Sequence, residues 1–410
     1  MMVSKINMIN AVGTATQVDS MNTLLTLGAT SGTAIFLSQY LGAKDYEKVK
    51  KTFGFSIILS IIIGALFFVI CSMFGSQIIN FYTNDSSVAT NGTYYLNIIK
   101  YSFIPSSLAF SYNYGFRSSK NTKIPLYISV FKMGLNVVLN YILIFGNFGL
   151  PNLGVQGAAI ATVISQWVGL VAYIIVSIKT KQNFIGTLKE MFVLEIKFIK
   201  NILSRIYTLI LNEVFFGFGE TLYVKAFSVL GANSMVAYFV GNKISSVFYV
   251  LIMGISSAST IILGLSLGEG NTKKAKEESN YFLGFSLILA FISILFIVLF
   301  SKPMVSMFSL ENDSIVNLSI QVVRVFSIKI ALRLFIVIAF SALRAGGDSK
   351  FLSFIDSGIM WLVGIPLVFI SVAFFELMGI PESKVTFRLW IMALLCGGLA
   401  LSIIRLKGIL

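Results

Sequence analysis

Long apolar stretches separated by short polar breaks recur along the whole chain, and they constrain its fold more than any other feature. Eleven of them reach the length of about 20 residues that a helix needs to cross a bilayer. Because lipid offers backbone polar groups no partners, and because barrel-type alternation is absent, each stretch is predicted to be a helix. The predicted spans are 13–40, 53–80, 95–116, 124–146, 155–179, 203–229, 235–266, 279–308, 315–343, 351–375 and 386–406.

The composition supports the same class, an all-α integral membrane protein. Charged residues make up 12% of the chain, against about 25% in soluble proteins, and the mean hydropathy is +0.88. The net charge of +14 does not indicate nucleic acid as a partner, because no basic run is interleaved with aromatic residues. Cys71 and Cys396 both lie in apolar stretches and form neither a disulfide framework nor a metal-binding spacing.

Histidine is absent, which excludes a histidine-containing metal site. Any proton chemistry must therefore use carboxylates, lysines or water. We expect no cofactor and no metal. The N-terminal segment lacks the apolar core of a cleavable signal peptide.

The loops between the predicted spans alternate in charge. One set holds twenty Lys and Arg residues, clustered at 44–51, 117–123, 179–205, 273–276, 344–350 and 405–407, whereas the other holds three, Lys302, Lys384 and Arg388. Cytoplasmic loops accumulate Lys and Arg. We therefore predict a multi-pass protein of the cell inner or plasma membrane whose basic loops and C-terminus lie in the cytoplasm.

An internal repeat predicts the domain organisation. Residues 32–53 align with 258–279, and residues 116–128 align with 343–355, at offsets of 226 and 227. We predict two pseudo-symmetric helical lobes, 1–190 with five helices and 191–410 with six, and by symmetry we expect a further helix before residue 1. Duplicated bundles suit alternating access around a central site.

Three segments resemble the MATE (multidrug and toxic compound extrusion) family. NVVLNYILIFGNFGLPNLGVQGAAIAT at 136–162 resembles its fifth-to-sixth helix region, and GTAIFLSQYLGAKDYEKVKK at 32–51 resembles the end of its second helix. ALRAGGDSKFLSFIDSGIMWLVGIPL at 342–367 is similar to its tenth-to-eleventh helix junction. The resemblance covers essentially the whole chain, starting at the family's second helix. It implies a monomeric antiporter, driven by a sodium or proton gradient, that exports drugs or other amphipathic organic compounds.

The coupling ion stays open at this point. Arg333 stands where sodium-coupled members of the family have an acid on helix ten, and Asn140 stands where some proton-coupled members have an acid on helix five. Glu213 lies about one turn from the helix-seven carboxylate of the sodium-coupled members. The alternatives are a flippase for lipid-linked sugars and an inactive fragment. A membrane enzyme is disfavoured because no paired nucleophile and base, and no metal-ligand set, is found.

Charges inside the spans are the main functional signal, since each costs a few kcal/mol in lipid unless it is paired or hydrated. Glu213 and Glu220 are seven residues apart and share a helix face, as do Lys329 and Arg333 at a spacing of four. Such charges form either buried salt bridges that lock the bundle or a cavity that binds substrate or ion. The candidate substrate- or ion-binding residues are Glu213, Glu220, Lys329, Arg333, Asn136, Asn140 and Asp356.

Glycines spaced by a helical turn predict close helix packing. Gly28 and Gly32 place bare backbone on one face, and Gly157 with its neighbouring alanines does the same at the start of the span 155–179. Bundle packing by itself is a sufficient explanation for these residues.

The charge bias makes a topology prediction. Reporter fusions after Lys51, Lys123, Lys189, Lys276 and Leu410 are expected to report the cytoplasm, and fusions near Asn84, Asn152 and Glu382 the outside. An outside signal after Lys276 would contradict the arrangement in two lobes.

Overall fold

The computed structural model describes residues 2–82, 86–149, 151–228, 232–308, 310, 312–347 and 349–370. Helices account for nearly all of these residues, and no strand occurs within the ranges just given. The chain divides into two compact units, Met1–Glu213 and Val214–Leu410. The predicted lobe boundary at 190/191 precedes this division and stays a prediction.

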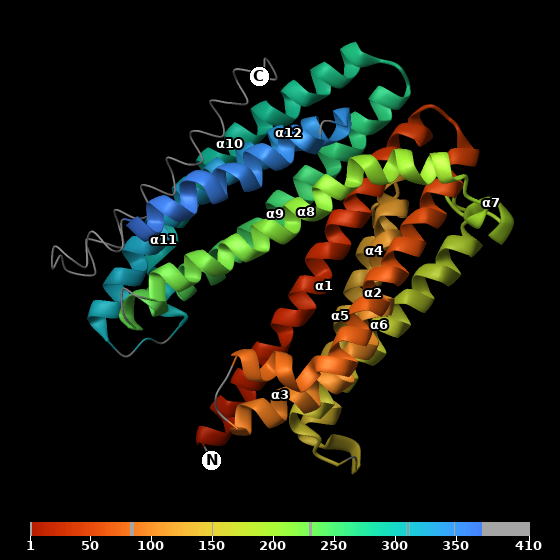
Figure 1. The fold of residues 1–410 in the computed structure, drawn as a ribbon. Helices are drawn as coiled ribbons and strands as arrows, with labels where there is room; N and C mark the ends of the chain where they lie inside the picture. The colour runs from red at the N-terminus through yellow and green to blue at the C-terminus, as the bar shows by residue number, and fades with distance from the viewer. Residues whose placement is uncertain are drawn as a thin grey trace. The chain divides into compact units, whose positions relative to one another are not determined.

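Unit 1 is built around a bundle of long helices. α1 (Met2–Gly42) packs against α2 (Tyr46–Tyr82), α3 (Ser86–Ile99) and α4 (Phe103–Ser118), and α5 (Lys123–Phe145) packs mainly on α6 (Gly154–Lys179). α3 lies at the end of the unit that also holds the N-terminus, whereas the short α7 (Leu188–Phe192) lies at the opposite end (Figure 1). Short 3₁₀ turns, Lys100–Ser102 and Asn147–Gly149, follow α3 and α5.

Unit 2 holds α9 (Ala232–Gly268), α10 (Thr272–Ser306) and α11 (Asp313–Gly346), which pack against one another. α8 (Ile196–Ser228) runs across the division between the units, so that its first half belongs to unit 1. α12 (Ser349–Ser353) leads into two π-helical segments, Phe354–Gly358 and Met360–Gly364, and the helical backbone continues to residue 370.

The predicted spans are confirmed as helices wherever the structure describes them. One detail differs: the predicted span 95–116 is interrupted by the 3₁₀ turn at Lys100–Ser102, and its first part extends back to Ser86. The predicted span 386–406 lies outside the described residues. Seven helical segments are long and apolar enough to cross a membrane, namely Tyr46–Asn80, Lys123–Phe145, Gly154–Lys179, Ile196–Gly219, Val236–Gly268, Thr272–Ser306 and Phe351–Ile370.

Helix ends follow from local side-chain chemistry. The side chains of Asn271 and Asn312 accept hydrogen bonds from the first turns of α10 and α11, and these bonds satisfy otherwise unpaired N–H groups. Gly146 and Gly347 end α5 and α11 with φ of 70° and 82°, a left-handed conformation that glycine adopts without strain. The loops therefore stop each helix at a defined residue.

The predicted glycine contacts are confirmed in unit 1. A Cβ atom on Gly28 would lie 3.0 Å from Ile210 Cα, and one on Gly32 would lie 2.8 Å from Ile206 Cγ2, so α1 and the first half of α8 approach closely. A Cβ on Gly157 would lie 2.6 Å from the Leu143 carbonyl oxygen. α6 therefore packs directly on the backbone of α5.

The segment between α6 and α8 is anchored to unit 1. Phe184 is fully buried against Phe53 and Phe116, with ring centroids 4.6 Å and 5.2 Å away. Lys50 Nζ donates to Glu190 Oε1 at 2.8 Å, and Thr187 and Glu190 form a reciprocal cap on α7. The hydrogen bond from Lys50, with those from Thr187, lowers the pKa of the Glu190 carboxyl to about 2. This ion pair therefore stays charged at any physiological pH.

The glycine contacts make a matched pair of substitutions informative. Gly157→Ala should destabilise the protein by about 1–3 kcal/mol, because the new methyl group overlaps the α5 backbone. Gly134→Ala in α5 is the control, since nothing lies within 4 Å of that position. Thermal unfolding of the detergent-purified protein measures both, and equal midpoints for the two variants would contradict the close contact.

Candidate functional site

A ladder of polar side chains lies between α5 and α6, inside the predicted membrane region. Lys132 Nζ donates to Gln166 Oε1 at 3.1 Å, and one turn further along α5 Asn136 Nδ2 donates to Thr162 Oγ1 at 3.4 Å. Asn140 Nδ2 donates to Asn136 Oδ1 at 2.9 Å. Because these α5 residues are spaced by four, their side chains line one face of the helix.

This ladder also includes charge from α1 and an open acceptor. The Asp19 carboxylate on α1 lies within electrostatic range of the Lys132 ammonium. Asn140 Oδ1 is buried and accepts no hydrogen bond from any residue that the structure describes. A buried acceptor without a partner costs about 1–3 kcal/mol. Asn140 Oδ1 is therefore available to accept a hydrogen bond from a bound group.

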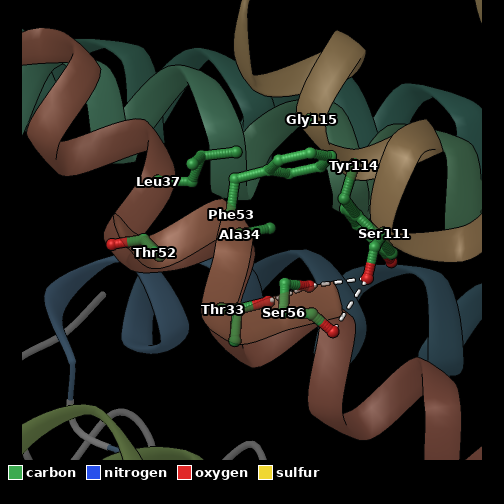
Figure 2. A pocket seen from close by; sticks show the side chains of 9 residues that line it. All are labelled: Thr33, Ala34, Leu37, Thr52, Phe53, Ser56, Ser111, Tyr114 and Gly115. Atoms are coloured by element: carbon green, nitrogen blue, oxygen red, sulfur yellow. Dashed lines mark hydrogen bonds between the residues drawn. The ribbon is translucent and has the colours of Figure 1, made fainter. Parts of the chain in front are cut away.

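Hydroxyl groups join α1, α2 and α4 nearby. Ser111 Oγ lies 2.7 Å from Ser56 Oγ and 2.8 Å from Ser60 Oγ, and Thr33 Oγ1 donates to Ser56 Oγ at 3.0 Å. Figure 2 shows Thr33, Ser56 and Ser111 at the edge of a cavity that Phe53 and Tyr114 also line. Its volume of about 10 Å³ is close to that needed for one water molecule. It is too small for an organic substrate, so we assign this network to packing.

Glu213 and Glu220 lie on α8, as predicted. Glu213 is buried, and its Cγ would lie 3.2 Å from a Cβ on Gly28, so the glycine makes room for the carboxylate beside α1. The Glu220 side chain lies outside the described part of the chain. The predicted pairing of these carboxylates with Lys329 and Arg333 stays a prediction.

Arg333 has a different, direct partner in unit 2. Its Nη1 donates to Asp356 Oδ1 at 2.8 Å, with the two side chains 20% and 8% exposed. The guanidinium also lies 4.8 Å from the centroid of the Phe216 ring on α8. Asp356 lies in the first π-helical segment, a local geometry that occurs frequently at functional sites. An ion pair, an aromatic ring and a π-helix thus meet inside the predicted membrane region.

Aromatic and sulfur contacts reinforce this junction. The Trp361 indole donates to the Phe215 carbonyl oxygen at 2.9 Å, and the two rings meet edge to face. Met360 packs on Gly219, where a Cβ would lie 2.5 Å from the methionine Cε. Lys329 lies one turn before Arg333, with its Nζ 5.2 Å from the Phe326 ring.

Unit 2 also contains an open pocket between α9 and the segment that follows α10. Its volume of about 560 Å³ falls in the range of small-molecule sites. The lining combines apolar and aromatic surface with a cation and two polar groups, from Val236, Phe239, Val240, Asn242, Lys243, Ser246, Phe308 and Leu310.

The structure thus brings together two pairs of the predicted residues, Asn136 with Asn140 and Arg333 with Asp356. Sequence reasoning missed the partners Gln166 and Thr162 and the pocket around Lys243. A signal for the first was present, because Thr162 and Gln166 are also four residues apart. The α9 residues of the pocket also recur at helical spacing, but no sequence signal indicates that Phe308 and Leu310, beyond the end of α10, complete its lining.

Helices of membrane-spanning length with charged groups inside them define a multi-pass membrane protein of the transporter class. The description MatE applies to the family model that matches residues 3–142 and 208–370, about three quarters of the chain. The chain belongs to this family, the MATE transporters. The match falls in two separate stretches, one in each half of the chain.

Individual relatives point the same way. The chain is 23% identical to the probable multidrug resistance protein NorM of Thermotoga maritima, over 90% of this chain and 79% of the relative. It is 24% identical to the probable multidrug resistance protein YoeA of Bacillus subtilis, over 84% and 75%.

Solved structures show the same fold. A MOP superfamily transporter from Pyrococcus furiosus, described with a binding pocket of reverse polarity, aligns with a TM-score of 0.87 at 19% identity over 97% of this chain and 87% of that one. The Vibrio cholerae MATE transporter VcmN aligns with a TM-score of 0.84 at 16% identity, over 99% and 91%.

The Arg333–Asp356 contact predicts non-additive effects on stability. Asp356→Asn should cost about 3–5 kcal/mol, because it leaves the Arg333 charge buried without its carboxylate. Arg333→Met combined with Asp356→Asn should recover much of that loss. The control is Glu269→Gln, which removes the exposed ion pair with Lys274 and should cost at most about 1 kcal/mol.

Thermal unfolding of the purified variants measures these changes. Additive losses in the double variant would show that the two side chains do not depend on each other.

Proposed function

We propose that this protein is a cation-coupled antiporter that exports amphipathic organic compounds across the cell membrane. The observation that supports this best is the ladder of Lys132, Asn136 and Asn140 beside Asp19 within unit 1. Polar and charged groups are expensive inside a membrane and usually mark an ion or substrate path. Membership of a transporter family supports the same reading.

The ladder favours the proton over the sodium ion as the coupling ion. Sodium would need several oxygen ligands, and the electrostatic partner of the Asp19 carboxylate is already the Lys132 ammonium. A metal cation bound there would be repelled by that ammonium, since like charges interact strongly in a low dielectric. A proton on Asp19 instead removes the interaction with Lys132. Proton binding therefore changes how α1 and α5 interact, as coupling requires.

The pocket around Lys243 is the proposed substrate-contact surface of unit 2. Phe239 and Phe308 offer aromatic surface, and Asn242 and Ser246 offer hydrogen bonds. Amphipathic organic compounds match this mixture, because pockets of this kind bind mainly through apolar area and orient the ligand with a few polar groups.

A second candidate function is the translocation of anionic amphiphiles such as lipid-linked sugars. One observation favours it: α11 carries Arg324, Lys329 and Arg333 within ten residues of a predicted span. A cationic span suits a phosphate-bearing substrate. The Pyrococcus furiosus transporter, for which a binding pocket of reverse polarity is described as suggesting a different function, supports this candidate.

Dye efflux tests the first proposal. Expression in cells depleted of their own efflux pumps should lower the accumulation of a lipophilic cationic dye, and collapsing the proton gradient should abolish the effect. Asp19→Asn should abolish efflux at unchanged protein level, because it removes the titrating group. Glu47→Gln is the matched carboxylate control on an exposed side chain and should leave efflux intact.

Loss of efflux on collapse of the sodium gradient alone would overturn proton coupling. Unchanged accumulation across a broad panel of organic compounds, with the protein correctly inserted, would overturn drug export and favour the second candidate.

A further inference from the structure

Lys100 occupies an unusual position on the surface of unit 1. It begins the 3₁₀ turn between α3 and α4, and its Nζ lies 5.7 Å from the Phe68 ring and 5.8 Å from the Tyr101 ring. Asn97 Oδ1 accepts a hydrogen bond from the ammonium at 3.3 Å. Within the ranges that the structure describes, no carboxylate forms an ion pair with it.

The surroundings of Lys100 are exposed and apolar. The α6 residues that share a face with Trp167 and follow it toward the cytoplasmic end are 46–60% exposed although they are large and hydrophobic, a stripe made of Val171, Ile175 and Ile178. Tyr101 and Trp167 are 54% and 45% exposed, and the Trp167 indole donates to the Tyr101 carbonyl oxygen at 3.2 Å. In a multi-pass membrane protein such a surface contacts lipid, and Trp and Tyr are enriched where chains meet headgroups.

Helix lengths place Lys100 near one face of the bilayer. Seventeen residues separate it from Arg117 at the end of α4, which is about 25 Å of helix. The same number separates Phe68 from Lys51 near the start of α2. Arg117 and Lys51 belong to the basic loops, so Lys100 approaches the far side of a hydrocarbon core about 30 Å thick. Its flexible stem can then reach the headgroup level.

We propose that Lys100 binds the phosphate of an anionic membrane lipid whose acyl chains lie along the α6 stripe. A lysine at the edge of lipid needs a counter-ion, and aromatic rings and one amide oxygen compensate its charge only partly. Lipid phosphate is the anion present at this depth. Inorganic phosphate has the same chemistry but lacks acyl chains for the stripe. The corner between α3 and α4 is therefore held at the headgroup level by a bound lipid.

Native mass spectrometry of the purified full chain tests this proposal. Offered equal amounts of phosphatidylglycerol and phosphatidylcholine with identical acyl chains, the unaltered protein should retain phosphatidylglycerol preferentially. Lys100→Met should lower that retention about fivefold, the effect expected of one lysine near the membrane surface. Lys100→Gln serves the same purpose if the methionine variant does not fold, and Lys100→Arg should keep the lipid.

The controls separate a specific site from general charge. Lys302→Met removes another exposed lysine, in α10, and should leave retention unchanged. Equal loss in Lys302→Met and Lys100→Met, or no loss in Lys100→Met and Lys100→Gln, would overturn the site. Displacement of the lipid by millimolar inorganic phosphate would show a site for free anions, which also overturns it.

Discussion

Backbone N–H and C=O groups inside lipid must find their partners within the protein, and the rest of this structure depends on that constraint. It makes every described span a helix, and it governs the exceptions as well. Where the 3₁₀ turn at Lys100–Ser102 interrupts the α-helical hydrogen bonds of the backbone, the Trp167 indole donates to the Tyr101 carbonyl oxygen. Hydroxyl groups within the spans follow the same logic, because Thr30 and Ser165 donate to carbonyl oxygens one turn back.

Charged side chains inside lipid also lack water, so they need partners within the protein. Arg333 is compensated by a carboxylate and an aromatic ring, whereas Lys132 is compensated by a glutamine amide and the field of Asp19. The first arrangement is a direct ion pair that favours stability. The second leaves the carboxylate able to exchange a proton without dismantling the bundle. The ion pair of Arg333 thus contributes to packing in unit 2. The polar surroundings of Lys132 contribute, as proposed, to coupling in unit 1.

The two predicted repeats differ in the contacts that their corresponding residues make. At the offset of 227 residues, Met133 and Gly134 of α5 correspond to Met360 and Trp361. Met360 and Trp361 pack on α8, but Met133 is 70% exposed and nothing lies within 4 Å of Gly134. Ser129 corresponds in the same way to Asp356. The two predicted repeats therefore differ in the side chains that join their helices.

Local sequence determined the class, the positions of ten described spans and the family resemblance, because span length, loop charge and motifs are properties of local sequence. It also located the close contact at Gly157. Tertiary structure decided which charges meet: Arg333 and Lys329 share a face, but only distance could show that Asp356, far along the chain, is the partner of Arg333. The pocket around Lys243 and the contact of Lys100 with Phe68 likewise join residues from separate parts of the chain. The helical period determines which side chains share a face of one helix, and the packing of the helices decides which residues that face contacts.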